Sequence, residues 1–320
     1  MNLSDLNPNQ LEAVKTTGGP VLIFAGAGSG KTRVLTHKIA YLIQEVGLPP
    51  ENILAVTFTN KAAQEMRERV TSLVKINTSK MSIGTFHSIC AGILRKNIHH
   101  LGYSNSFTIY DSSDSKLLIK NVINEMNLDV KQFDPSSYQY MISAKKNLLL
   151  SPGQVLDSAE GYIDEKLADI YSNYQSDLEK NNALDFDDLL VLPIKLFQEN
   201  QDILNYYRQK FKYVLVDEYQ DTNHPQFQFI NLLSEVHRDI FVVGDDDQSI
   251  YGWRGADVRN ILDFSKQYPD SQIIKLEQNY RSTGNILEAA YSVVSKNQSR
   301  AEKKLWTEND EGTKIKLVEC

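Results

Sequence analysis

The sequence has few cysteines, no long apolar run and no excess of basic residues. Its only two cysteines, Cys90 and Cys320, are too few for a disulfide framework and lack the spacing of a metal site. The first ten residues, MNLSDLNPNQ, carry no cationic segment ahead of an apolar one, so we expect no secretory signal. No apolar run approaches the length that spans a bilayer. These absences favour a cytoplasmic protein that does not enter a membrane.

The charge balance excludes fewer classes of function than these absences do. Acidic residues outnumber basic ones by 41 to 34, and the formal net charge is −7. This balance argues against a broad phosphate-binding face, although a narrow groove lined by a few selected side chains would not need a basic surface. A length of 320 residues is enough for two compact parts.

The strongest single motif is AGAGSGKT, residues 25–32. It lies between the apolar run VLIF and a segment, 32–46, with apolar residues at helical spacing. A strand, a glycine-rich loop and a helix in this order bind a phosphate chain, because backbone N–H groups and the positive helix end converge there. Lys31 would reach the terminal phosphates and Thr32 would ligate Mg²⁺. Ala25 replaces the first glycine of the strict pattern, which is acceptable if this residue ends the strand.

Short apolar runs alternate with helical patterns through most of the chain. This alternation predicts a parallel sheet with helices on both faces. The expected strands are 21–24, 53–59, 81–86, 213–217, 240–244 and 273–276, and the expected helices are 3–14, 32–46, 60–70 with Asn60 as its N-cap, 87–97 and 285–296.

The region from 110 to 183 interrupts this alternation. It holds the helical segments 116–126, 138–147 and 160–179 and almost no β-type run, so we expect an all-helical insertion. The chain finishes on KIKLVEC, residues 314–320, which reads as a strand without a partner. Since a compact domain rarely stops within a strand, we expect the sequence to be the N-terminal part of a longer protein.

Two further strands end in acids and amides. VLVDE ends in Asp217 and Glu218, at the sheet edge where ligands bind in open α/β folds. Asp217 suits Mg²⁺ and Glu218 is placed to deprotonate an attacking water; an acidic pair that caps the next helix is the alternative. In GDDDQ, Gln248 could reach the γ-phosphate.

The segment YGWRG that follows combines aromatics with an arginine. Tyr251 and Trp253 suit stacking on unpaired bases, and Arg254 suits the nucleic-acid backbone. Core aromatics are the alternative, but the glycines beside Trp253 favour a loop. One segment would then contact phosphate at one end and bases at the other, which would couple nucleotide hydrolysis to binding of the bases.

Seven motifs in this order resemble the UvrD/Rep/PcrA family of superfamily 1 DNA helicases: LNPNQ, AGAGSGKT, TFTNKAAQEM, GTFHS, DEYQDT, VGDDDQSIYGWRGA and LEQNYRS. The resemblance covers the whole chain and implies an α/β, RecA-like P-loop lobe interrupted by the all-helical insertion. The implied domains are 1–109 with 184–275 for the ATP-binding lobe, 110–183 for the insertion, and 276–320 for the truncated start of a second RecA-like lobe.

The resemblance also implies roles for individual residues. Gln10 would read adenine, whose ring Arg33 and Tyr280 would sandwich. Gln248 would sense the γ-phosphate, and Arg281 would reach it from the second lobe as an arginine finger. The implied catalytic residues are Lys31, Asp217, Glu218, Gln248 and Arg281; the metal ligands are Thr32 and Asp217; and the nucleotide-binding residues are Gln10, Ala25, Gly26, Ala27, Gly28, Ser29, Gly30, Lys31, Thr32, Arg33, Tyr280 and Arg281.

The family's single-stranded DNA contacts are matched by seven residues, which are Phe58, Asn60, Thr85, His87, Tyr251, Trp253 and Arg254. Bland alternatives stay open for three of the implied site residues. Phe58 could belong to the core, His87 could cap its helix, and Arg281 could be an ordinary surface arginine.

The implied function is 3′-to-5′ translocation on single-stranded DNA, driven by Mg-ATP hydrolysis, with displacement of the opposite strand. The implied partners are single/double-strand junctions and repair or replication proteins. With one lobe alone, we expect weak nucleotide binding, slow hydrolysis and no unwinding. A kinase or transporter-type ATPase is one alternative, although it has no need of Trp253 and Arg254 in this setting. A module that binds ATP and DNA without motor activity is the other.

Overall fold

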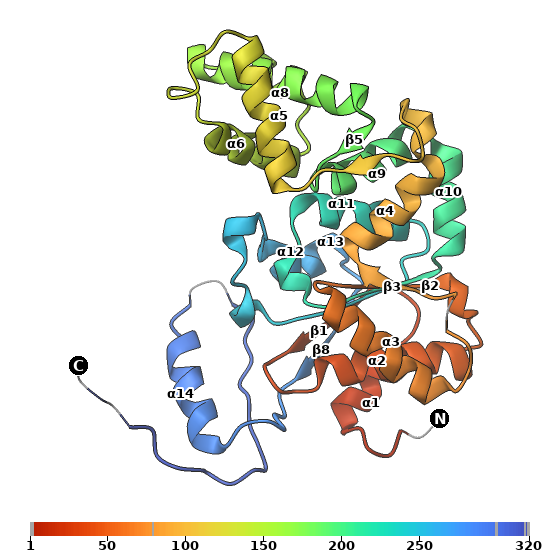
Figure 1. Ribbon diagram of the computed structural model, residues 1–320. Helices are drawn as coiled ribbons and strands as arrows, with labels where there is room; N and C mark the ends of the chain where they lie inside the picture. The colour runs from red at the N-terminus through yellow and green to blue at the C-terminus, as the bar shows by residue number, and fades with distance from the viewer. Residues whose placement is uncertain (1–2, 79, 298–299, 317, 319–320) are drawn as a thin grey trace. The chain divides into compact units, whose positions relative to one another are not determined.

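The computed structural model describes residues 3–78, 80–297, 300–316 and 318. The chain divides into two compact units, which can be followed by colour in Figure 1. Unit 1 consists of residues 1–85, 208–222 and 233–320, and unit 2 of residues 86–207 and 223–232. Each unit has a hydrophobic core of its own.

Unit 1 is built around a six-stranded parallel sheet with the strand order β3–β2–β6–β7–β1–β8. Every residue of the four central strands is buried, as expected for parallel strands that are covered on both faces. This arrangement confirms the predicted α/β fold class. The strands are β1 (Val21–Ala25), β2 (Ile53–Thr57), β3 (Ser82–Thr85), β6 (Tyr213–Val216), β7 (Ile240–Gly244) and β8 (Gln272–Leu276).

Three helices, α1 (Pro8–Lys15), α2 (Lys31–Gln44) and α3 (Asn60–Val74), share a core with alternate residues of the strands. Two expected helix starts are corrected. α1 starts later than expected, because Asn7 caps it in a reciprocal capping box with Gln10. Thr59, not Asn60, is the N-cap of α3, since Thr59 has an extended backbone and its side chain accepts a bond from a first-turn N–H.

Shorter helices, α12 (Arg259–Leu262) and α13 (Phe264–Gln267), precede β8, and α14 (Gly284–Val294) follows it. Residues 300–307, termed the strap, then lie beside the chain that leaves β8. The Trp306 N–H donates to the Glu277 carbonyl at 3.0 Å, and the Asn279 N–H donates to the Trp306 carbonyl at 2.8 Å. The part of the chain after β8 therefore belongs to unit 1.

The strand predicted for 314–320 is wrong where the structure describes it. Residues 314–316 and 318 have no regular structure and are exposed. An alternating pattern forms a strand only beside a partner that accepts its backbone hydrogen bonds. Residues 317, 319 and 320, with Cys320 among them, lie outside the described residues.

Unit 2 is mainly helical. Its helices are α4 (Phe86–Asn97), α5 (Ser112–Glu125), α6 (Pro135–Asn147), α7 (Pro152–Asp157), α8 (Tyr162–Lys180) and α9 (Asp188–Glu199), while α10 (Gln201–Lys210) and α11 (His224–Ser234) each cross a boundary between the units. Two short strands, β4 (Thr108–Ile109) and β5 (Ala183–Leu184), pair in parallel. Within the described ranges, no helix is both long and apolar enough to cross a bilayer.

Unit 2 is larger than the insertion expected at 110–183. That range holds α5 to α8, and its two ends fall beside β4 and β5. The difference arises because α4 and α9 share a small core with β5, to which Leu94, Leu184 and Leu189 contribute. Pattern changes along the chain mark where helices begin, but they do not show which helices pack together.

Candidate functional site

Most predicted site residues lie at one edge of the sheet in unit 1. Because the six strands are parallel, their carboxyl ends meet at this edge. There β1 leads into the phosphate loop, β6 leads into Asp217 and Glu218, and β7 leads into residues 245–248. β2 leads into Phe58, and β8 leads into residues 278–281.

The phosphate loop connects β1 to α2. Ala25 is the last residue of β1 and pairs within the sheet, which is why an alanine is tolerated there. Gly28 and Gly30 have φ angles of 72° and 92°, in the left-handed region that favours glycine. The Ser29 hydroxyl donates to the Gly26 carbonyl at 2.8 Å and closes the loop. α2 begins at once with Lys31, so its unpaired first-turn N–H groups are available to an anion.

Lys31 and Glu218 meet although they are far apart in the sequence. Lys31 Nζ lies 2.8 Å from Glu218 Oε2, and their side chains are 12% and 34% exposed. Glu218 has a φ of 50°, which is unusual for a residue with a side chain. Backbone strain of this kind costs about 1–3 kcal/mol and is concentrated at functional sites. The fold therefore brings the phosphate-binding lysine to the proposed catalytic base.

Asp217 is a buried carboxylate beside Glu218. Its residue is 7% exposed, and its Oδ1 accepts the Glu218 N–H at 3.0 Å. Burial and, second, the charge of Glu218 raise the pKa of Asp217 to about 7, although Lys31 opposes the shift. A divalent cation would offset both causes, and carboxylate and hydroxyl oxygens are the ligands that Mg²⁺ prefers. The donors Asp217 and Thr32 therefore fit this ion.

Gln220, which is absent from the predicted site residues, joins two parts of the site. Its Nε2 donates to Glu218 Oε2 at 2.9 Å, and its Oε1 accepts the Asp245 N–H at 2.9 Å. Gln248 donates in turn to the Asp245 carboxylate. A continuous path of hydrogen bonds thus runs from Lys31 to Gln248. The sequence signal that could have identified Gln220 is its position two residues after Glu218, at the acidic end of a strand.

Three successive aspartates, residues 245–247, precede Gln248. Their oxygens lie within 4.8 Å of one another, close enough to hold a metal ion. The strap supplies the countercharge instead. Lys303 Nζ lies 2.9 Å from Asp245 and 2.8 Å from Asp247, and it also contacts the middle aspartate. Arg300 binds Asp247 through Nε and Nη2 at 3.1 and 2.9 Å. We therefore assign no metal to these aspartates.

Of the residues expected around adenine, Gln10 lies at the start of α1, Arg33 in the first turn of α2 and Tyr280 after β8. Gln10 is fully buried; its Nε2 donates to the Ser29 carbonyl at 2.9 Å and its Oε1 accepts the Asn7 N–H at 3.2 Å. Asn7 Nδ2 also donates to the Tyr280 hydroxyl at 2.8 Å. Asn7 thus connects Gln10 to Tyr280, which is half exposed. The adenine-reading role of Gln10 and the sandwich formed with Arg33 stay predictions.

Asn279 is a second residue that is absent from the predicted set. It is buried, its Oδ1 accepts the N–H groups of Arg281 and Ser282 at 2.8 and 2.7 Å, and its Nδ2 donates to the Ala27 carbonyl. The Tyr280 N–H donates to the Gly28 carbonyl at 3.0 Å. The QNYRS segment is therefore bonded to the phosphate loop. The reach of the Arg281 side chain to a γ-phosphate stays a prediction.

Four of the expected DNA contacts form one cluster. The rings of Phe58 and Tyr251 stack with their centroids 4.8 Å apart, and the Arg254 guanidinium lies 4.5 Å from the centre of the Trp253 ring. Trp253 is 69% exposed and Phe58 is half-buried, so neither is a core residue. Exposed rings with a cation beside them are typical of surfaces that bind single strands, and the role of these four residues in DNA binding stays a prediction.

The other three expected contacts are Asn60, Thr85 and His87. Asn60 is exposed at the start of α3, and Thr85 is the half-buried last residue of β3. His87 is in unit 2, where its ring meets the edge of the Phe186 ring at 5.7 Å and burial lowers its pKa. His87 does not cap α4, because that helix begins one residue earlier. Roles of these residues in DNA binding stay predictions.

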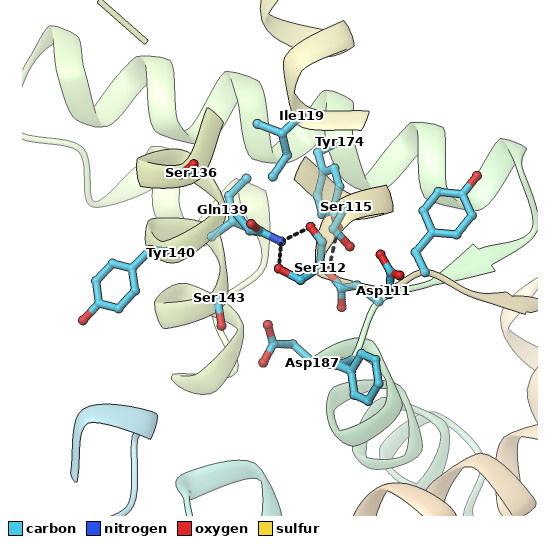
Figure 2. Close-up of a pocket in the computed structure, with 14 residues that line it drawn as sticks. Asp111, Ser112, Ser115, Ile119, Ser136, Gln139, Tyr140, Ser143, Tyr174 and Asp187 are labelled. Atoms are coloured by element: carbon cyan, nitrogen blue, oxygen red, sulfur yellow. Dashed lines mark hydrogen bonds between the residues drawn. The ribbon is translucent and has the colours of Figure 1, made fainter. Parts of the chain in front are cut away.

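Unit 2 has a cavity of about 470 Å³ between α5, α6 and the turn before α9 (Figure 2). Its wall carries hydroxyls and carboxylates, and Gln139 Nε2 donates to the Ser112 carbonyl at 3.0 Å. Asp185, in the same wall, pairs with Lys146 at 2.8 Å, and Asp188 pairs with Lys146 at 2.7 Å. None of the predicted site residues lines this cavity.

Known proteins match the chain along almost all of its length. The family model described as the UvrD/REP helicase N-terminal domain matches residues 6–269, and that of the UvrD-like helicase C-terminal domain matches residues 274–320. The ATP-dependent DNA helicase PcrA of Bacillus subtilis is 54% identical over 313 residues, which are 98% of this chain and 42% of that protein.

Proteins of the same name give similar values in two other organisms. The Staphylococcus aureus protein is 51% identical over 318 residues, or 99% of this chain and 44% of that protein. The Leuconostoc citreum protein is 50% identical over 311 residues, or 97% and 42%. The chain therefore spans less than half the length of the curated relatives that it matches.

Proposed function

Since this chain belongs to the UvrD/REP helicase family, we propose that it forms the ATP-binding part of an ATP-dependent DNA helicase. One observation carries the proposal. The hydrogen-bond path from Lys31 ends at Gln248, and the exposed cluster of Tyr251, Trp253 and Arg254 begins three residues later. A phosphate site and a base-stacking surface thus share one short segment.

The proposed hydrolysis uses residues at the carboxyl edge of the sheet. ATP phosphates would bind the N–H groups of the phosphate loop and attract Lys31 away from Glu218. Glu218, freed from that pair, would accept a proton from the attacking water. Asp217 and Thr32 would hold Mg²⁺, which neutralises phosphate charge when it is bound.

Two groups would act on the third phosphate. Gln248 would exchange its bond to Asp245 for one to a γ-phosphate oxygen. Arg281, whose backbone Asn279 fixes beside the phosphate loop, would add a positive charge at the same oxygens. Gln10, Arg33 and Tyr280 would select and hold adenine.

The proposed nucleic-acid substrate is single-stranded DNA. Bases would stack on Trp253 and on the Phe58–Tyr251 pair, and Arg254 would bind the backbone. We extend the proposal to Asn60, Thr85 and His87, to 3′-to-5′ movement, and to action at single/double-strand junctions in DNA repair or replication. Residues 1–109 and 184–275 would form the ATP-binding lobe, 110–183 an insertion, and 276–320 the start of a second lobe. The proposed location is the cytoplasm.

Steady-state ATP turnover with and without a single-stranded oligonucleotide tests the proposal. We expect slow turnover by this chain, a rise in rate when the oligonucleotide is added, and no strand displacement, because the chain spans 42% to 44% of the relatives' lengths. The matched control is Glu218→Gln, which keeps the size of the side chain and removes the base. Equal turnover by this variant would reject hydrolysis at this site and leave a module that only binds.

A further inference from the structure

The aspartates 245–247 and the two strap cations form a closed ion cluster. The side chains of Lys303 and Asp245 are each 4% exposed, and Arg300 and Asp247 are also largely buried. Three carboxylates against two cations leave one net negative charge, since −3 + 2 = −1. A small cavity of about 130 Å³ adjoins the cluster and is also lined by Ala27 of the phosphate loop and by Gln248. The cluster therefore borders the place where ATP, an anion, would bind.

Lys303 and Asp247 are held in their charged forms. Burial by itself would lower the pKa of Lys303, but the charges of residues 245–247 outweigh it and raise this pKa. Burial by itself would raise the pKa of Asp247, but hydrogen bonds from Arg300 and Lys303 hold this pKa below its usual value. Removal of either cation would thus leave a buried carboxylate charge without its partner.

Asp245 has two partners that matter for phosphate sensing. Its carboxylate accepts a bond from Gln248 Nε2, and it pairs with Lys303 at 2.9 Å. Gln248 can reach a phosphate only after it leaves Asp245. Loss of a hydrogen bond by a buried carboxylate costs free energy unless a second partner remains. Lys303 is that second partner.

The strap is bonded to the turn at residues 245–248 and packs against the phosphate loop. The Ala301 N–H donates to the Asp246 carboxylate at 2.7 Å, and the Lys304 N–H donates to the Glu277 carboxylate at 2.9 Å. Leu305 lies over Gly26 so closely that a Cβ on this glycine would have no room. The two cations are therefore fixed with respect to the groups that would bind phosphate.

We propose that Lys303 and Arg300 are positioning residues of the γ-phosphate sensor: they stabilise the charges of residues 245–247 while Gln248 moves from Asp245 to the third phosphate. This inference rests on the proposed function. Loss of Lys303 leaves the Asp245 carboxylate with Gln248 as its side-chain partner, beside the Asp247 N–H at 3.2 Å, so the amide stays on the carboxylate. The chain then binds nucleotide less well and no longer passes the nucleotide state to the loop that contains Trp253.

The test compares Lys303→Met and Arg300→Met with Lys304→Met, the same substitution at the next, exposed lysine. A fluorescent single-stranded oligonucleotide is titrated with and without a non-hydrolysable ATP analogue and Mg²⁺. We expect analogue binding to weaken about tenfold in Lys303→Met and about threefold in Arg300→Met. In both variants the nucleotide-dependent change in DNA affinity should shrink while the nucleotide-free affinity stays as in wild type. Lys304→Met should behave as wild type, and Lys303→Arg should recover part of the change.

A wild-type nucleotide response in folded Lys303→Met overturns the inference and leaves the proposed function standing. If circular dichroism shows that Lys303→Met is not folded, Arg300→Met decides, and a wild-type response there overturns the inference. A wild-type chain that binds neither the analogue nor the oligonucleotide refutes the proposed function and this inference with it. A role that is only structural would lower DNA affinity equally with and without nucleotide, which also contradicts the inference.

Discussion

Lys146 in unit 2 and Lys31 in unit 1 both pair with carboxylates, and they differ in how far these ion pairs are enclosed. In unit 2, Lys146 is 1% exposed and pairs with Asp185 and Asp188, while the Tyr174 hydroxyl donates to Asp185 at 2.9 Å. Burial alone would lower the pKa of Lys146, but the two aspartates raise it well above its usual value. Burial and, second, the charge of Asp185 nevertheless raise the pKa of Asp188 to about 7. The cluster is enclosed within unit 2, and it ties α6 to the start of α9.

The cluster around Lys31 has a similar balance of charges but is less enclosed. Lys31 has one ionic contact, to the partly exposed Glu218, and the neighbouring Asp217 is buried with its pKa raised to about 7. Glu218 also has a strained backbone. Ion pairs that are enclosed within a unit stabilise its fold, whereas charged groups that are partly exposed at a sheet edge are available to a ligand. The two clusters therefore predict opposite results when they are mutated.

The largest effect should come from breaking the enclosed cluster around Lys146. Lys146→Met leaves two buried carboxylates without their cation and should destabilise the chain by about 3–5 kcal/mol. Urea unfolding followed by circular dichroism measures this loss. Lys120→Met, at an exposed lysine on α5, is the matched control and should change stability little. A stable Lys146→Met protein would show that the two clusters do not differ as described.

Lys31→Met should have nearly as large an effect, but on activity. Loss of the phosphate-binding charge should lower ATP turnover about 10²- to 10³-fold, while the unfolding free energy should change little because Lys31 has only one partner here. Turnover and urea unfolding are measured on the same preparation. A variant that loses stability rather than activity would contradict the assignment of this cluster to ligand binding.

Asp217→Asn should sharpen the comparison through pH. Folding raises the pKa of Asp217 from its ordinary value of 3.8 to about 7, so the native state holds its proton more tightly than the unfolded state. The stability from that proton is present at low pH and is lost as the pH rises through about 7. The variant should therefore gain on wild type by roughly 2–4 kcal/mol between about pH 4 and about pH 8. If the difference in unfolding free energy between Asp217→Asn and wild type is the same at every pH, Asp217 is not a buried carboxylate with a raised pKa.

The smallest effect should come from the exposed loop. Trp253→Ala should weaken binding of a single-stranded oligonucleotide by about 1–3 kcal/mol, with no loss of stability because the ring is 69% exposed. Fluorescence anisotropy measures the binding. Trp253→Phe keeps a stacking face and should retain most of the affinity. Equal binding by wild type and Trp253→Ala would favour a nucleotide-binding enzyme with no nucleic-acid substrate.

Much of this site follows from local patterns in the sequence. The phosphate loop, the acids after β6 and the aromatic loop are contiguous motifs beside apolar runs, and parallel strands bring their ends to one edge. The strands that were predicted from apolar runs differ from the observed ones by a few residues at their ends. The predicted strand is wrong for residues 314–316 and 318, because such a pattern forms a strand only beside a partner.

The parts of the site that were not predicted from the sequence depend on contacts between segments that are far apart along the chain. Gln220, Asn279 and Lys303 each connect two segments of the site, and nothing in the residues beside Lys303 indicates the aspartates it contacts. Lys146 is likewise about 40 residues from its partners, with separations of 39 and 42. The extent of unit 2 has the same origin, because helix patterns do not show which helices share a core.

The most direct test of the account is the affinity of a single-stranded oligonucleotide for wild type and Gln248→Ala, each with and without a non-hydrolysable ATP analogue and Mg²⁺. The account predicts that the analogue changes DNA affinity in wild type and leaves it unchanged in Gln248→Ala, because Gln248 joins the phosphate site to the loop that contains Trp253. An equal change in both proteins, or none in wild type, would contradict it.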